Sequence, residues 1–228
     1  MKKIVIILGT AHSANTSGKK SPDNQIQEYK YSRQICQQLQ QKLQQKGYTT
    51  YIDIPQDNIP GTQTQELRRR TSIVNAICQQ HGPDNCIYIS IHINAAASDN
   101  KWHTAGGWTA YTTPGNTKAD TLATYLYQAA QTHLKDYIQQ FPTNKQQGHY
   151  DSKQSPIRTD YTDHDPDREA RFYVLQHTKC PAVLTENLFQ DNKADTKYLL
   201  STKGQRAIIQ THLTGILNYI NHINQQDQ

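Results

Sequence analysis

Residues 87–94 read IYISIHIN, and this stretch decides the fold class. Isoleucine occupies every second position, which is the alternation of a β-strand with one apolar face. The other face carries Tyr88, Ser90, His92 and Asn94, so that His92 lies near the carboxyl end of a buried strand. In open α/β sheets, ligands bind beyond the carboxyl ends of the parallel strands. We therefore expect a functional site at this edge of the sheet.

Strand-like and helix-like segments alternate along the chain. Strands are expected at 3–9, 48–54, 86–93, 107–113 and 181–186, and helices at 24–46, 63–80, 117–139, 168–177, 192–200 and 203–223. Such alternation is typical of an α/β domain. We predict one domain over 1–228, with a mostly parallel, twisted sheet of about six strands and helices on both faces. Asp23 or Asn24 is the expected cap of the first helix.

Two stretches interrupt the alternation, at 95–106 and 140–167. Both are polar, and both are long for connections within a compact domain. Loops of this kind often form the walls or lids of a functional site. We expect them to be loop elaborations of the one domain. Arg158, His103, His149 and His164 lie in these loops and are candidates to line a cleft.

The composition narrows the classes of partner. The 228 residues carry a formal net charge of +5, which would assist approach to an anionic polymer such as the bacterial cell wall. Basic residues are scattered apart from 68–70, without the aromatic interleaving of a nucleic-acid groove, so we expect no nucleic-acid partner. The oligomeric state has no signature in the sequence. The four cysteines stand in apolar segments without a CxxC pair, which favours buried free thiols.

The amino terminus, MKKIVIILGTAHS, has an apolar run shorter than the roughly 7–15 residues that a secretion signal needs. No segment has the length of a membrane span. We therefore expect synthesis in the cytoplasm without a signal peptide, and no membrane-spanning helix.

Four residues, three near strand ends and one early in a helix, could carry chemistry. His12 follows the first strand, Glu28 lies early in the first helix, and His92 ends the third strand. Two imidazoles and one carboxylate would leave one position open on a tetrahedral zinc ion, as in catalytic zinc sites. Glu186 ends another strand at the same edge, where it could transfer protons during amide hydrolysis. Taken singly, each residue also has a structural explanation, such as a hydrogen-bonded histidine or a glutamate that favours the helix dipole.

These motifs resemble those of the zinc-dependent N-acetylmuramoyl-L-alanine amidases, the amidase type 3 family of cell-wall hydrolases. Five segments carry the likeness in order: GTAHSANTSGKKSPD, EYKYSRQICQQLQQKL, LRRRTSIVN, SIHINA and PAVLTENLFQDNKADTKYLL. The resemblance implies that His12, Glu28 and His92 bind one Zn²⁺ per chain and that Glu186 is the general base and acid. Leu188 departs from the family pattern, since a glycine is common at its position.

The implied reaction is hydrolysis of the amide bond between N-acetylmuramic acid and L-alanine in peptidoglycan, the muramyl peptide partner. Without a signal peptide or a separate wall-binding module, the chain is expected to be a phage lysis enzyme, an endolysin that acts on the wall after release. Two alternatives stay open: another zinc peptidase or amide hydrolase on the same scaffold, and a non-catalytic peptidoglycan-binding module. Arg70 is expected to support the fold through buried hydrogen bonds, and Trp102 and Trp108 either to stack on sugar or to close an apolar patch.

Overall fold

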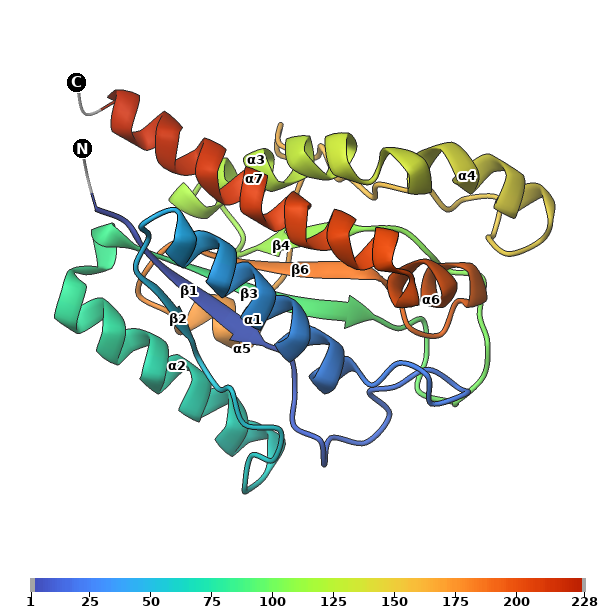
Figure 1. Ribbon diagram of the computed structural model, residues 1–228, viewed down its shortest axis with the longest axis horizontal. Helices are drawn as coiled ribbons and strands as arrows, with labels where there is room; N and C mark the ends of the chain where they lie inside the picture. Colours follow the sequence, from blue (N-terminus) through green and yellow to red (C-terminus); the bar gives the residue numbers. More distant parts are fainter. Residues whose placement is uncertain (1–2, 227–228) are drawn as a thin grey trace.

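A six-stranded sheet in the order β2-β1-β3-β6-β4-β5 organises the computed structural model, which describes residues 3–226 (Figure 1). The strands are β1 (Val5–Thr10), β2 (Thr50–Ile52), β3 (Cys86–Asn94), β4 (Thr109–Thr112), β5 (Arg168–Glu169) and β6 (Ala182–Phe189). Four strands, β2, β1, β3 and β6, run parallel, and β4 pairs antiparallel with β6. The predicted mostly parallel α/β sheet is confirmed.

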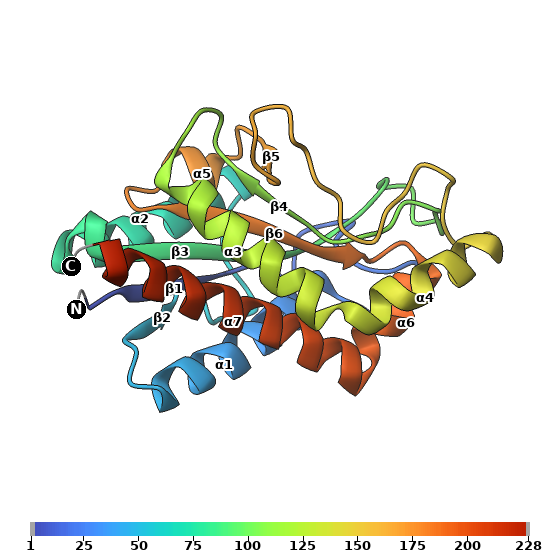
Figure 2. The same cartoon turned by 90° about the horizontal axis from the view of Figure 1, so that it is seen from above.

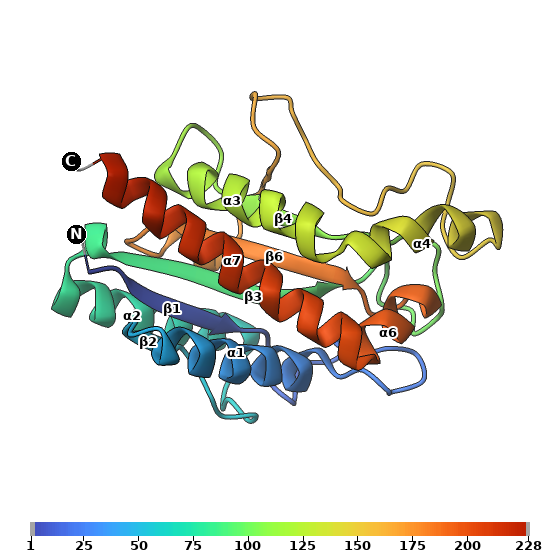
Figure 3. The same ribbon diagram turned by 45° about the horizontal axis from the view of Figure 1, so that its top comes forward.

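Helices cover both faces of the sheet, as predicted (Figure 2). On one face lie α1 (Glu28–Gln45), α3 (Lys118–His133) and α7 (Thr202–Gln226), with α3 and α7 side by side (Figure 3). On the other lie α2 (Gln63–His81), which a 3-10 turn at Pro83–Asn85 follows, and the short α5 (Tyr173–Gln176). Helices α4 (Lys135–Gln146) and α6 (Lys193–Leu200) lie beyond the carboxyl ends of β3 and β6, at the right of Figure 1.

The alternating side chains of β3 belong to two apolar clusters, one on each face of the sheet. Ile87, Ile89 and Ile91 pack with α1, α3 and α7, whereas Tyr88 packs on the opposite face with residues of α2 and α5. Each isoleucine is almost fully buried, and removing one such side chain from water contributes about 1.5–3 kcal/mol. A shift of one residue in the register would exchange these faces. The alternation therefore fixes which side chains of β3 lie on each face of the sheet, including those at its carboxyl-end edge.

Two expected helices are divided differently in the structure. The helix predicted at 117–139 is two helices, because α3 ends at His133 and α4 continues to Gln146, with Pro142 inside it. The predicted loop at 140–167 is therefore shorter and begins after α4. The helix predicted at 168–177 is strand β5 followed by α5, because the backbone of Arg168 and Glu169 pairs with β4.

The first helix begins at Glu28 and not at residue 24. Its expected caps form a tight turn instead: Asp23 accepts a hydrogen bond from Ser21 Oγ (2.6 Å), and Asn24 has a φ of +59°. Asn and Asp favour such turns because their short polar side chains bond the nearby backbone. The turn brings Lys20 beside Gln27 as a β-bridge and so sets Glu28 as the first residue of the helix.

Strand β6 continues past its expected end at residue 186. Opposite His92 and Asn94 of β3 stand Glu186 and Phe189, so β6 contains one extra residue and forms a bulge. Leu188 lies in that bulge with a φ of +67°, a region that favours glycine. Its side chain is fully buried, and this burial offsets the backbone strain.

Cys36, Cys78, Cys86 and Cys180 are buried and free, as expected. Among residues 3–226, no helix has the length and apolarity needed to cross a bilayer.

Candidate active site

His12, Glu28 and His92 meet at the carboxyl-end edge of the sheet, each offering one donor atom within 4.8 Å of the others. Glu28 lies between the histidines: its Oε1 is 3.0 Å from His92 Nδ1, and its Oε2 is 3.4 Å from His12 Nε2. The imidazole rings are 5.1 Å apart and nearly perpendicular. Because β1 and β3 are neighbours and α1 begins beside them, residues 80 positions apart share one small site.

Two buried arginines hold the backbone of His12, whose φ of +45° is unusual for a residue other than glycine. Arg33 Nη2 and Arg70 Nη2 donate to the His12 carbonyl oxygen over 2.9 and 3.1 Å. Arg70 also forms ion pairs with Asp53 (2.9 Å) and Glu66 (3.0 Å). Arg70 thus has the structural role that the sequence indicated, and it fixes the position of His12.

His92 is supported on its other side. Its Nε2 lies 3.0 Å from Ser90 Oγ, and its carbonyl oxygen accepts a hydrogen bond of 2.9 Å from Asn187 Nδ2. A hydrogen bond at one ring nitrogen fixes which tautomer the other nitrogen presents. With a metal ion bound at Nδ1, the ring proton would be on Nε2 and directed at Ser90 Oγ. Burial lowers the pKa of His92, which favours this neutral ligand form.

The Glu28 carboxylate is 1% exposed, and its Oε2 has no hydrogen-bond partner among the described residues. Burial raises the pKa of Glu28, but the neighbouring His12 and His92 outweigh burial and hold it well below the usual value. A buried carboxylate with an unsatisfied oxygen needs a cation or a further donor.

The donor set fits a zinc ion. Zinc in proteins is bound by imidazole nitrogen and carboxylate oxygen at about 2.0–2.2 Å, so tetrahedral donors lie about 3.3–3.6 Å apart. The separations of 3.0 and 3.4 Å between Glu28 and the two histidines approach this value. Three protein ligands leave one position for water or substrate, as in catalytic sites.

Glu186 lies directly beside this group, because β3 and β6 pair His92 with Glu186. On its other side it pairs with Thr109 of β4. The Oε2 atom of Glu186 is buried without a hydrogen-bond partner in the described part of the chain. Burial, and secondarily the negative charge of Glu28, raises the pKa of Glu186 well above its usual value, whereas Lys19 and Arg158 act to lower it.

The residues after Glu186 hold the surrounding loops, a role that the sequence patterns did not indicate. Asp191 Oδ2 accepts hydrogen bonds from the backbone nitrogens of Ala96 (2.7 Å) and Ala97 (3.2 Å). Asn192 Nδ2 donates to the carbonyls of His103 (3.2 Å) and His149 (2.7 Å). One short turn therefore fixes both loop elaborations, and only its polar composition, DNKAD, marks it in the sequence.

Asp195, in the first turn of α6, is fully buried and completes this scaffold. It accepts hydrogen bonds from the hydroxyls of Tyr137 (2.8 Å) and Tyr150 (2.6 Å). Its other oxygen accepts from the backbone nitrogens of Gly107 (3.2 Å) and Phe189 (2.9 Å). Asp195 thus joins α4, the loop after it, and the ends of β4 and β6.

The cleft candidates have different surroundings. Arg158 lies over the Phe189 ring, 5.1 Å from its centroid, on the Glu186 side of the site. His103 pairs instead with Asp99 over 2.8 Å. Trp108 is fully buried, donating to Asn187 Oδ1 over 2.9 Å, so it closes an apolar patch and is not available to stack on sugar. Trp102 is partly exposed beside Lys193.

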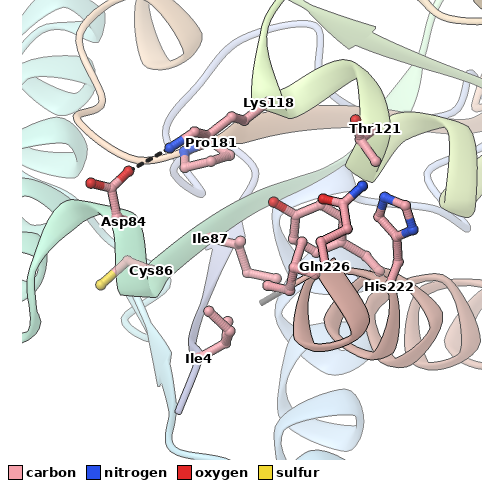
Figure 4. Close-up of a pocket in the computed structure, with 11 residues that line it drawn as sticks. Ile4, Asp84, Cys86, Ile87, Lys118, Thr121, Pro181, His222 and Gln226 are labelled. Carbon is pink, nitrogen blue, oxygen red and sulfur yellow. Dashed lines mark hydrogen bonds and ion pairs between the residues drawn. The ribbon is translucent and has the colours of Figure 1, made fainter. Parts of the chain in front are cut away.

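A cavity of about 260 Å³ lies at the opposite edge of the sheet, near the amino ends of β1 and β3 (Figure 4). Ile4, Ile87 and His222 help to line it, and Lys118 forms an ion pair with Asp84 (2.7 Å) at its rim. It contains none of the four candidate site residues.

Comparisons with known proteins identify the family and the fold of the chain. The family model described as N-acetylmuramoyl-L-alanine amidase matches residues 4–218. An N-acetylmuramoyl-L-alanine amidase from Clostridium difficile 630 has a similar structure, with a TM-score of 0.70 and 19% identity over 97% of this chain and 98% of that one. The catalytic domain of CwlV, an amidase from Bacillus (Paenibacillus) polymyxa var. colistinus, has a TM-score of 0.67 and 16% identity over 96% and 98%.

The catalytic domain of the CD27L endolysin, which targets Clostridia difficile, has a TM-score of 0.63 and 20% identity over 94% of this chain and 97% of that one. At these identities, the structural likeness shows a shared fold. No curated protein sequence matches the chain.

Proposed function

The chain belongs to the N-acetylmuramoyl-L-alanine amidase family, and from this premise we propose that it hydrolyses the amide bond between N-acetylmuramic acid and L-alanine in peptidoglycan. The observation that carries the proposal is the convergence of His12, Glu28 and His92 beside Glu186. A metal-ligand set and an adjacent carboxyl group are the parts that hydrolysis of an amide requires.

His12 Nε2, His92 Nδ1 and the Glu28 carboxylate would hold one Zn²⁺ per chain. When bound, zinc supplies Lewis-acid chemistry, polarising a carbonyl group and making a water molecule more acidic. The rigid backbone around the ligands supports this assignment, since ligand geometry depends on such outer contacts. Arg33 and Arg70 fix His12, and Ser90 and Asn187 fix His92.

Glu186 would act as the general base and acid. Its carboxylate takes a proton from the water that attacks the lactyl carbonyl, and it then delivers that proton to the departing nitrogen of L-alanine. The products are a free lactyl carboxyl group and a free amino terminus, so one water is consumed for each bond broken. The pairing of Glu186 with His92 supports this role, because it sets the carboxyl group beside the ligands on one face of the sheet.

A role in bacterial lysis extends the proposal. The protein would be made in the cytoplasm and reach the wall on release, and its fold is similar to that of the catalytic domain of the CD27L endolysin. Turbidity of a bacterial suspension should fall when purified protein is added from outside. An undiminished turbidity, with isolated peptidoglycan still digested, would contradict lysis but not the amidase activity.

Digestion of purified peptidoglycan, followed by mass spectrometry of the released material, tests the proposed reaction. We expect stem peptides with a free amino-terminal L-alanine, and glycan strands with free lactyl carboxyl groups. New termini inside the peptide would identify a peptidase on this scaffold. Binding to the wall without release of any peptide by zinc-loaded protein would identify a binding module.

A further inference from the structure

A second group of acidic side chains lies away from the candidate active site. Asp120, in the first turn of α3, and Asp165 and Asp167, just before β5, each offer one carboxylate oxygen within 4.8 Å of the others. Thr112 Oγ1, at the end of β4, donates to Asp167 Oδ2 over 2.6 Å. Because β4 is antiparallel to β6, this end of β4 is directed away from Glu186.

The buried carboxyl group of this cluster has an unmet hydrogen-bond requirement. Asp167 is 1% exposed, and its Oδ1 has no hydrogen-bond partner among residues 3–226. The Asp165 side chain lies within hydrogen-bonding range of Asp167, so two carboxyl groups face each other. Within the described chain, no lysine, arginine or histidine forms an ion pair with any of the three aspartates. A buried carboxyl oxygen without a hydrogen-bond donor requires a proton or a cation as its partner.

The oxygens of Asp120 and Asp165 are held in place by local contacts. Asp120 accepts hydrogen bonds from the Thr117 backbone nitrogen (2.5 Å) and from Thr117 Oγ1 (2.9 Å), which complete the cap of α3. Asp165 Oδ1 accepts from the Asp167 backbone nitrogen over 3.3 Å. Each carboxylate oxygen can accept further contacts. The cluster is therefore ordered before any ligand binds.

The chemistry of these donors selects the ligand. All three are carboxylate oxygens without nitrogen or sulfur, which favours a hard cation. Ca²⁺ binds oxygen at about 2.3–2.6 Å, so its ligands lie up to roughly 4.6–5.2 Å apart, and it accepts irregular geometry completed by water and carbonyl groups. Mg²⁺ requires a tighter octahedron at about 2.0–2.1 Å. We propose that Asp120, Asp165 and Asp167 bind one Ca²⁺ ion.

The bound ion would fasten the long segment before β5 to the start of α3 and the end of β4. Arg158, earlier in the same segment, lies on the Glu186 side of the active site. Calcium would thus stabilise one wall of the site without taking part in the reaction. The competing arrangement is a shared proton, since burial raises the pKa of Asp167 to about 8.

Calcium titration of the zinc-loaded protein at pH 7.5, by isothermal calorimetry and by thermal unfolding, tests the site. We expect one Ca²⁺ bound per chain and a Tm that rises by about 5 °C at saturation, because an ion that binds only the folded state stabilises it. Asp165→Asn, at the partly exposed end of the cluster, should weaken binding at least about tenfold. Asp163→Asn, an exposed neighbour outside the cluster, should bind as the wild type does.

Absence of both a binding heat and a Tm change at 10 mM Ca²⁺, roughly ten times the Kd of about 1 mM of the weakest protein calcium sites, would overturn the proposal in favour of the shared proton. An unchanged affinity in a folded Asp165→Asn variant would also overturn it. The wild-type titration decides the question if that variant does not fold. Peptidoglycan hydrolysis does not enter this test, so its outcome is independent of the proposed function.

Discussion

His92 on β3 and Glu186 on β6 occupy paired positions on neighbouring parallel strands. This one register contact sets a proposed metal ligand beside the proposed proton carrier. Both side chains lie on the same face of the sheet, because paired residues of parallel strands share a face. The arrangement depends on the strand order, in which β6 lies next to β3 although 87 residues separate Asn94, the last residue of β3, from Ala182, the first residue of β6.

Removing the hydrogen bond between Ser90 and His92 should weaken metal binding without unfolding the protein. In Ser90→Ala, nothing would fix the Nε2 tautomer of His92, so Nδ1 would present its lone pair less often. We expect zinc affinity to fall about 10–100-fold, measured by competition with a chelating dye. The exposed Ser98→Ala is the control, and equal zinc affinity in the two variants would contradict this role of Ser90.

Arg70 should be essential for stability. Arg70→Met would leave Asp53 and Glu66 buried without their ion pairs, and breaking a buried ion pair costs about 3–5 kcal/mol. Urea unfolding should show a loss of that size in the free energy of unfolding. The neighbouring Arg69 is exposed, so Arg69→Met should change it by about 0.5 kcal/mol or less. Similar losses in both variants would mean that the Arg70 ion pairs contribute little.

His212 should make the fold sensitive to acid. It is 0% exposed, with Nδ1 2.8 Å from the Ile208 carbonyl and Nε2 2.9 Å from Thr185 Oγ1. Burial lowers its pKa from 6.5 to about 4. Because the folded pKa lies below the unfolded one, this stability is fully present above about pH 6.5 and is lost as pH falls through 4. The loss is about 3 kcal/mol.

Unfolding of wild type and His212→Asn between pH 7 and pH 4 measures this contribution. The wild-type free energy of unfolding should fall by about 3 kcal/mol more than that of the variant over this range. Asp195, whose pKa burial raises to about 6, titrates with the opposite sign but cancels in the comparison. The exposed His177→Asn is the control. Parallel pH profiles for wild type and His212→Asn would contradict the assignment.

Much of the fold could be predicted because alternation and helical spacing are local signals. Isoleucine at every second position of β3 indicated a buried strand, and the structure has it. Helix ends were less predictable. Asp23 was expected to cap α1, but its side chain bonds Ser21 and Gln25 within a turn. A residue with two competing local partners does not reveal its choice in the sequence.

The four candidate site residues could be named from strand ends and family motifs, and the structure brings them together. Their supports could not, since these depend on contacts between distant segments. Nothing near residue 90 indicates that Ser90 bonds the ring of His92, and nothing near Asn192 indicates that it holds His103 and His149. Leu188 shows the same limit, because its left-handed backbone is imposed by the bulge in β6.

The central claim is the division of roles between two glutamates, one that binds metal and one that moves a proton. Zinc content and peptidoglycan hydrolysis should be measured together on Glu28→Gln and Glu186→Gln. We predict that Glu186→Gln retains about one zinc per chain but loses about 10²–10⁴-fold in turnover, whereas Glu28→Gln loses both zinc and turnover. Near wild-type turnover in Glu186→Gln, or full zinc content at wild-type affinity in Glu28→Gln, would contradict the account.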